Sequence, residues 1–197
     1  SMEGSRWLAR GGILRGRVRR PAAGTGGRKS GRRFVVIARA VLANRIATMS
    51  TFSVEFHRVL RTSPERVYRA FTTPAAFAKW LPPHGFAAEI DAMDARVGGQ
   101  YRMRFVNLDS GNGHGFSGEY LELVPGERIR YTARFDEALG LPGEMQTTVG
   151  LRAVSCGTEV AIRQDGIPDM IPREGCQLGW QESLALLALL VEAEVPG

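Results

Sequence analysis

Histidine is the residue type in this chain best suited to metal binding or to acid–base chemistry near neutral pH. The chain has three, His57, His84 and His114. None has the His-x-x-x-His spacing or the close carboxylate pair of a zinc or iron site, so we expect no metal and no cofactor. His84 follows Pro82-Pro83 and is a candidate ligand or catalytic residue, with an exposed loop residue as the alternative. His114 lies among glycines and is expected to be solvated.

Glu122 is the best single candidate for a catalytic carboxyl group. It shares a predicted strand face with Tyr120 and Gly118. A carboxyl group in an apolar pocket has a raised pKa and can act near neutrality. The inward face is ambiguous, because the two leucines that flank Glu122 compete with Phe116 and Tyr120 for it. The alternative is that Glu122 pairs across the strands with an outward arginine.

The sequence contains no other catalytic motif. Its serines lack a Gly-x-Ser-x-Gly elbow, and Cys156 and Cys176 have no catalytic signature around them. The glycine-rich stretches lack the Lys-Ser/Thr ending of a phosphate loop. The catalytic candidates are therefore Glu122 and His84 alone, and an enzyme is the less favoured interpretation.

Bulky apolar side chains are candidates for the wall of a ligand cavity. They supply apolar area, and a tyrosine or tryptophan adds a polar tip that can orient a ligand. The alternative is that they fill the core, since a cavity exists only where packing is incomplete. The candidates are Trp80, Tyr101, Met103, Phe105, Tyr120, Tyr131, Phe135, Trp180 and Leu184.

The elements that position these residues follow from apolar spacing and chain breakers. A strand rich in β-formers at 54–60 is followed by helix starts at Ser63-Pro64 and Thr73-Pro74. From Phe86 onward, glycines and prolines separate stretches of alternating apolar and polar residues, which predicts a meander of antiparallel strands. The alternation turns one apolar row inward and one arginine-rich row outward.

A long helix is predicted after Pro172, because apolar residues there recur at spacings of three and four. Leu186, Leu189 and Leu190 widen the apolar stripe, so we expect this helix to be buried over more than one face. The stripe itself comprises Trp180, Leu184, Leu187, Ala188 and Val191.

Charge divides the chain into two parts. Residues 1–50 carry twelve Lys and Arg against Glu3 alone, a net charge of +11, whereas residues 51–197 carry −5. We expect the basic leader to be disordered, and Met49 is an alternative start of the protein. A transit peptide and a nucleic-acid-binding arm are the functional alternatives for the leader. The mildly acidic remainder is one domain, and nucleic acid is not an expected partner.

Cysteine content and hydropathy indicate the cellular compartment in which the protein is expected. Two cysteines make no disulfide framework, and no window approaches roughly 18 consecutive apolar residues. We therefore expect a cytoplasmic protein without a membrane span. A homodimer is kept as an alternative to a monomer.

Seven short stretches within about residues 52–194 form a joint pattern. They are Pro64 to Thr72, Trp80-Leu81-Pro82, Gly85-Phe86, Asp94 to Gly99, Gly118 to Arg128, Gly157 to Val160 and Gly179-Trp180. In these stretches the chain resembles the activator of Hsp 90 ATPase homologue-like family, within the SRPBCC superfamily of START, polyketide cyclase and pollen-allergen-type domains.

The resemblance implies an α+β helix-grip (START-like) fold over residues 51–197. In that fold a curved antiparallel sheet wraps around a long C-terminal helix, and two short helices follow the first strand. It also implies a cavity between sheet and helix that holds a small hydrophobic, lipid- or polyketide-like molecule. The alternatives are a cyclase- or hydratase-type enzyme using a cavity carboxylate or His, and a co-chaperone-like interaction module. The chain lacks the large extra domain of the co-chaperone branch.

Overall fold

The structure, a computed structural model, describes residues 50–141 and 143–192. Almost all of the predicted basic leader, residues 1–49, lies outside the described residues. The elements in chain order are β1 (Thr51–Leu60), α3 (Pro64–Thr72), α4 (Pro74–Trp80), β2 (Phe86–Met93), β3 (Gln100–Asn107), β4 (Gly113–Val124), β5 (Arg128–Phe135), the 3-10 helix η1 (Glu137–Leu139), β6 (Met145–Val154), β7 (Gly157–Pro168) and α5 (Arg173–Val191).

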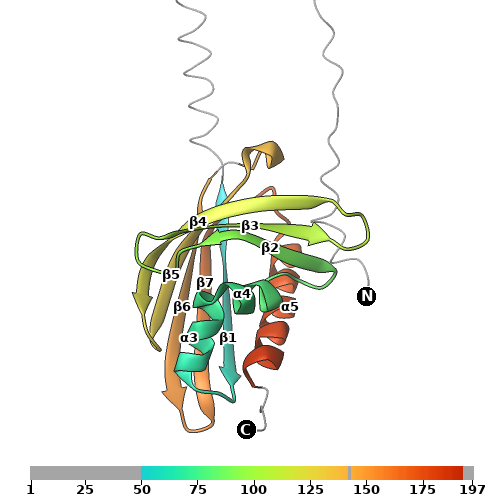
Figure 1. Cartoon of the computed structure of the whole chain (residues 1–197). Helices are drawn as coiled ribbons and strands as arrows, with labels where there is room; N and C mark the ends of the chain where they lie inside the picture. The colour runs from blue at the N-terminus through green and yellow to red at the C-terminus, as the bar shows by residue number, and fades with distance from the viewer. Residues whose placement is uncertain (1–49, 142, 193–197) are drawn as a thin grey trace, which may run out of the picture.

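The strands form one antiparallel sheet in the order β1-β7-β6-β5-β4-β3-β2. Strands β2 to β7 neighbour one another in chain order, as the predicted meander requires, and β1 joins the edge beside β7. The sheet is curved, and α5 lies within the curve, in contact with α3, α4 and β1 (Figure 1). The expected α+β helix-grip fold is confirmed.

The alternation along the strands decides which side chains face α5. Tyr101, Met103 and Phe105 on β3 are buried, while the arginines between them are exposed. On β5, Ile129 and Tyr131 are buried in the same way. The predicted inward rows of both strands are therefore confirmed.

The two short helices begin at the predicted signals. The hydroxyl of Ser63 accepts the N–H of Arg66 (3.4 Å), and Pro64 occupies the first turn of α3, where a missing N–H costs no hydrogen bond. Pro74 occupies the same position in α4, after Thr73. Both helices direct their apolar side chains onto the concave face of the sheet.

The last helix, α5, is buried less widely than predicted. Leu184, Leu187 and Val191 are buried and Leu186 is half-buried, but Leu189 is 74% exposed. The expectation of burial over more than one face is wrong at Leu189, because α3, α4 and β1 pack on the other side of the helix. None of the helices in the described part of the chain has the length and apolar character needed to span a bilayer.

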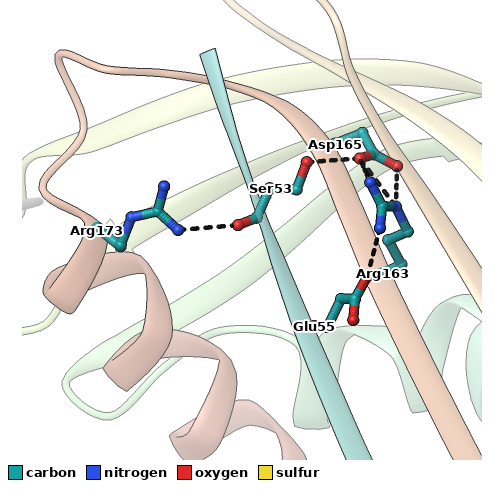
Figure 2. A network of polar contacts seen from close by, with 5 residues as sticks. All are labelled: Ser53, Glu55, Arg163, Asp165 and Arg173. Carbon is teal, nitrogen blue, oxygen red and sulfur yellow. Dashed lines mark hydrogen bonds and ion pairs between the residues drawn. The ribbon is translucent and has the colours of Figure 1, made fainter.

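A polar network fixes the start of α5 to β1 (Figure 2). Arg163 on β7 donates to Asp165 (2.7 Å) and to Glu55, and the Ser53 hydroxyl also donates to Asp165 (2.6 Å). Arg173, in the first turn of α5, donates to the Ser53 carbonyl (3.1 Å). The Arg163 hydrogen bonds lower the pKa of Asp165, so this carboxyl stays ionised near neutrality and acts as an anchor.

Candidate ligand-binding site

The concave face of the sheet carries two groups of aromatic side chains. We call the first the closed cluster. Its rings come from α3, α4, β3, β4 and β5, and each residue is at most 4% exposed. Neighbouring ring centroids are 4.6 to 6.4 Å apart, the range of edge-to-face packing. The members are Phe71, Phe77, Trp80, Tyr101, Tyr120 and Tyr131.

The polar tips of the closed cluster are bonded within the protein. Trp80 donates its indole N–H to the carbonyl of Ala70 (2.8 Å), and Tyr120 donates to the carbonyl of Phe71 (2.9 Å). Tyr101 donates to a carbonyl on β5 (2.6 Å). Burial raises the pKa of all three tyrosines of the cluster, so none exchanges a proton near neutrality. The closed cluster therefore has the properties of a packed core.

The side chains of Tyr101 and Thr132 make hydrogen bonds to the backbone of the paired strands β4 and β5. The Tyr101 hydroxyl donates to the carbonyl of Thr132, whose own hydroxyl accepts the N–H of Glu119 (3.2 Å). A Cβ atom at Gly118 would lie 1.8 Å from the Thr132 carbonyl oxygen and 2.7 Å from the Tyr101 ring. Only glycine at this position leaves room for the Tyr101 ring to cross to β5.

We call the second group the open cluster. It lies where β2 and β4 begin and β3 and β5 end, and it consists of His114, Phe86, Phe105, Phe116 and Phe135. The first three phenylalanines are 8 to 9% exposed, and His114 and Phe135 are half-buried. The imidazole centroid is 5.8 to 6.3 Å from the four phenyl centroids. His114, which was predicted to be solvated, is half-buried, because it faces the same side of β4 as Phe116.

Electrostatics around His114 favour the neutral imidazole. Burial among the phenyl rings lowers its pKa, and the carboxylate of Asp136 opposes this effect only in part. Asp136 lies close to the strand because residue 115 is glycine, where a Cβ atom would be 2.1 Å from the Asp136 Oδ2. At pH 7 the open cluster therefore contains an uncharged ring with one N–H donor and one acceptor nitrogen.

Trp180 on α5 shares core neighbours with Phe135 of the open cluster. Its ring centroid is 5.9 Å from that of Phe56, and its indole N–H donates to Gln164 (2.6 Å). Trp180 and Phe135 both pack against a small core group that contains Met145.

Glu122 does not share a face with Tyr120 and Gly118, and that prediction is wrong. Tyr120 pairs with Tyr131 and Glu122 pairs with Arg130, and the register shifts between these two pairs. This irregularity at position 121 turns Glu122 to the outer face. There its carboxylate lies 3.5 Å from Arg128 and 4.0 Å from Arg130, which is the cross-strand pairing that we kept as the alternative.

The other two histidines lie away from both clusters. His84 is exposed in the loop before β2, where its backbone N–H donates to Glu182 on α5 (3.1 Å) and its ring is 3.7 Å from the same carboxylate. His57 is on the outer face of β1, bonded to Glu159 (2.6 Å). Within residues 50–141 and 143–192, no group of three or more His, Cys, Asp or Glu is arranged to hold a metal ion.

The nine predicted wall residues divide between the two clusters and the core around them. Met103 and Leu184 are buried together with the Trp and Tyr residues of the closed cluster. Phe105 and Phe135 are in the open cluster, and Trp180 shares core neighbours with Phe135. Phe86, Phe116 and His114 belong to the open cluster but were not among the predicted wall residues. The sequence signal for two of them is the alternation along β4, which places His114 and Phe116 on one face. In the structure, His114 also pairs with Phe105 on β3.

Two surface hollows lie away from the open cluster, and the first is lined in part by Tyr101 of the closed cluster. One, of about 440 Å³, is on the sheet around Arg102, Ser117 and Arg134, and the last of these is already paired with Glu144 (2.6 Å). The other, of about 690 Å³, lies between β1 and α5 and includes the exposed side chain of Leu189. It is the apolar surface that the interaction-module alternative requires, but nothing in the described residues shows what covers it.

Comparisons with known proteins agree with this architecture. Residues 61–192 match the family model described as Activator of Hsp90 ATPase homolog 1-like protein. A crystal structure of a protein from Chromobacterium violaceum is 60% identical, with a TM-score of 0.70, and the match covers 72% of this chain and 98% of that one. No functionally curated protein matches the chain.

Two further structures show how widely the fold is shared. A crystal structure of a protein from Rhodobacter sphaeroides is 25% identical, with a TM-score of 0.62, over 70% of this chain and 90% of that one. A solution structure of an AHSA1-like protein from Aeromonas hydrophila is 20% identical, with a TM-score of 0.58, over 72% of this chain and 92% of that one. At 20% identity the likeness supports the fold alone.

Proposed function

Because the chain belongs to the family of activator of Hsp90 ATPase homolog 1-like proteins, whose domains commonly bind hydrophobic molecules, we propose that it binds a small, mainly apolar molecule against the open cluster. The observation that carries the proposal is the half-buried pair His114 and Phe135, which pack against Phe86, Phe105 and Phe116, whose rings are 8 to 9% exposed. Concave, aromatic-lined surfaces with few polar groups are the usual form of small-molecule sites.

Binding would be driven by removal of apolar surface from water, at roughly 25 cal/mol per Å². Phenyl rings from four strands present both edges and faces, which suits flat or ring-containing ligands better than flexible chains. The closed cluster supports the site as a rigid floor, because its rings and polar tips are already engaged. The ligand then contacts Phe105, Phe135 and Trp180 among the predicted wall residues.

We rank the enzyme alternative below binding. Glu122 lies on the outer face beside two arginines, and His84 lies in an exposed loop held by Glu182. The tyrosines of the closed cluster have raised pKa values and donate to backbone carbonyls or lie fully buried. A bound molecule should accordingly be recovered chemically unchanged. We also propose a cytoplasmic location for the domain.

Native mass spectrometry of the purified protein, before and after organic extraction, tests the proposal. We expect a co-purifying small molecule, or binding of an added member of a lipid and polyketide panel to the extracted protein. Phe135→Ala should weaken this binding by roughly tenfold or more, since the lost contact area of a phenyl ring is worth about 1.4 kcal/mol or above. Val59→Ala, in the hollow beside α5, is the matched control and should bind as the unchanged protein does. Absence of any bound molecule across the panel would overturn the proposal.

A further inference from the structure

The polar atoms of the open cluster belong to one side chain. In the part of the chain that the structure describes, neither imidazole nitrogen of His114 makes a hydrogen bond to the protein. Its neighbours are the four phenyl rings and, through its charge, Asp136. Three of the four polar tips of the closed cluster, by contrast, reach backbone carbonyls, and the fourth, that of Tyr131, is hydrogen-bonded to the Thr147 side chain. The only buried side-chain nitrogen or oxygen without a partner among the described residues is Arg130 Nε, so both imidazole nitrogens of His114 reach solvent, where water or a ligand can satisfy them.

We propose that His114 makes the open cluster selective for flat aromatic molecules that carry a hydroxyl group, with phenols as the best-matched class. This inference rests on the proposed function, since it assigns the ligand class of the same site. A phenolic hydroxyl can donate to the bare nitrogen of the imidazole or accept from its N–H, so it is satisfied whichever tautomer is present. The rest of a phenol is an apolar ring that suits the surrounding phenyl groups.

Other polar groups match the site less well. A carbonyl can only accept, so it uses the imidazole in one of its two roles. A carboxylate would enter an apolar cluster beside a neutral imidazole and within the field of Asp136, which disfavours a second negative charge. The position of His114 in the cluster is fixed by its pairing with Phe105 across β3 and β4, so the hydroxyl would be held at one end of the aromatic surface.

Binding of two probes of equal shape tests the inference. Calorimetric titration of the full chain with 2-naphthol and with 2-methylnaphthalene compares a hydroxyl with a methyl group on one ring system. We expect 2-naphthol to bind about tenfold more tightly, the value of one well-formed hydrogen bond. His114→Phe should abolish this preference while 2-methylnaphthalene binds as before. His114→Gln, which keeps a donor and an acceptor, should retain part of it, and His57→Gln on the outer face should retain all of it.

The outcomes separate the two proposals. Equal affinities for the two probes, or a preference that survives in His114→Phe, would overturn the role of His114 and leave the apolar site in place. Failure of both probes and of the lipid and polyketide panel to bind would remove the proposed function itself. Circular dichroism of each variant confirms that the fold is retained before the affinities are compared.

Discussion

The closed and open clusters consist of similar residues on the same face of the sheet. They differ in whether their polar atoms are hydrogen-bonded within the protein. In the closed cluster, Trp80, Tyr101 and Tyr120 donate to backbone carbonyls, and every ring is at most 4% exposed. In the open cluster, His114 has ring neighbours in place of hydrogen-bond partners among the described residues. A satisfied aromatic group makes a core, whereas a half-buried group with free polar atoms is suited to recognition.

The two clusters are also built from different secondary-structure elements. The helices α3 and α4 cover the closed cluster and supply three of its rings. The open cluster consists of strand residues alone and lies where β2 and β4 begin and β3 and β5 end. The rings of the open cluster are 8% exposed or more, whereas those of the closed cluster are 4% exposed or less.

The largest effect should come from removing the centre of the closed cluster. Trp80→Ala deletes a fully buried indole that lies 4.6 Å from the Phe71 ring and bonds to Ala70, so we expect a loss of about 3–5 kcal/mol in the free energy of unfolding. Urea denaturation followed by circular dichroism measures it. Trp180→Ala, at the half-buried site on α5, should cost clearly less. Equal losses would contradict the distinction between the two clusters.

The close contact at Gly118 provides the next test. A methyl group there would meet the Thr132 carbonyl and the Tyr101 ring, neither of which can move without breaking the hydrogen bond between them. We expect Gly118→Ala to destabilise the fold by about 1–3 kcal/mol. Gly150→Ala on β6 is the matched control, because its nearest neighbour is 4.0 Å away, and it should change the free energy of unfolding by no more than about 0.5 kcal/mol. Similar effects at both positions would contradict the crossing geometry of Tyr101.

A smaller, pH-dependent effect should appear in the open cluster. Because burial lowers the pKa of His114 in the folded protein, the unfolded chain binds a proton at this residue more readily. The free energy of unfolding should therefore fall as the pH drops below about 6.5, the ordinary value for histidine, until the lowered pKa is passed. His114→Phe should flatten this dependence. Denaturant titrations between pH 7.5 and 5 measure it, and an unchanged slope in the variant would show that another group is responsible.

The smallest effect is expected on the outer face. Glu122→Gln removes a partly exposed carboxylate from Arg128 and Arg130, and such ion pairs contribute about 0–1 kcal/mol. The variant should also bind 2-naphthol as the unchanged protein does. A large loss of binding or of stability would place Glu122 in the site after all and would revive the catalytic carboxylate.

Much of the fold could be predicted, because alternation along strands and spacings of three and four residues along helices indicate which faces are buried. Tyr101, Met103 and Phe105 were assigned inward from alternation alone, and they are buried. The same rule failed at Glu122, because it assumes an unbroken strand and the register shift between Tyr120 and Glu122 reverses the faces beyond it.

The site was harder to predict than the fold. The glycines around His114 indicated a turn, although the strand β4 already begins at Gly113. Whether an aromatic residue is fully buried or partly exposed depends on which neighbouring elements cover it. Trp80 and Phe135 are both bulky and apolar, but Trp80 is fully buried and Phe135 is half-buried. For the same reason the exposure of Leu189 could not be read from the stripe of α5, since spacing does not show which neighbours cover a helix.

The central claim, that ligand contacts the open cluster and leaves the closed cluster undisturbed, is tested most directly by a ¹H–¹⁵N correlation spectrum titrated with 2-naphthol. The account predicts that the backbone amide signals of His114, Phe116 and Phe135 shift in proportion to occupancy. The indole N–H signal of Trp80, held by the carbonyl of Ala70, should stay in place. A shifted Trp80 signal with unchanged signals from the open cluster would contradict the account.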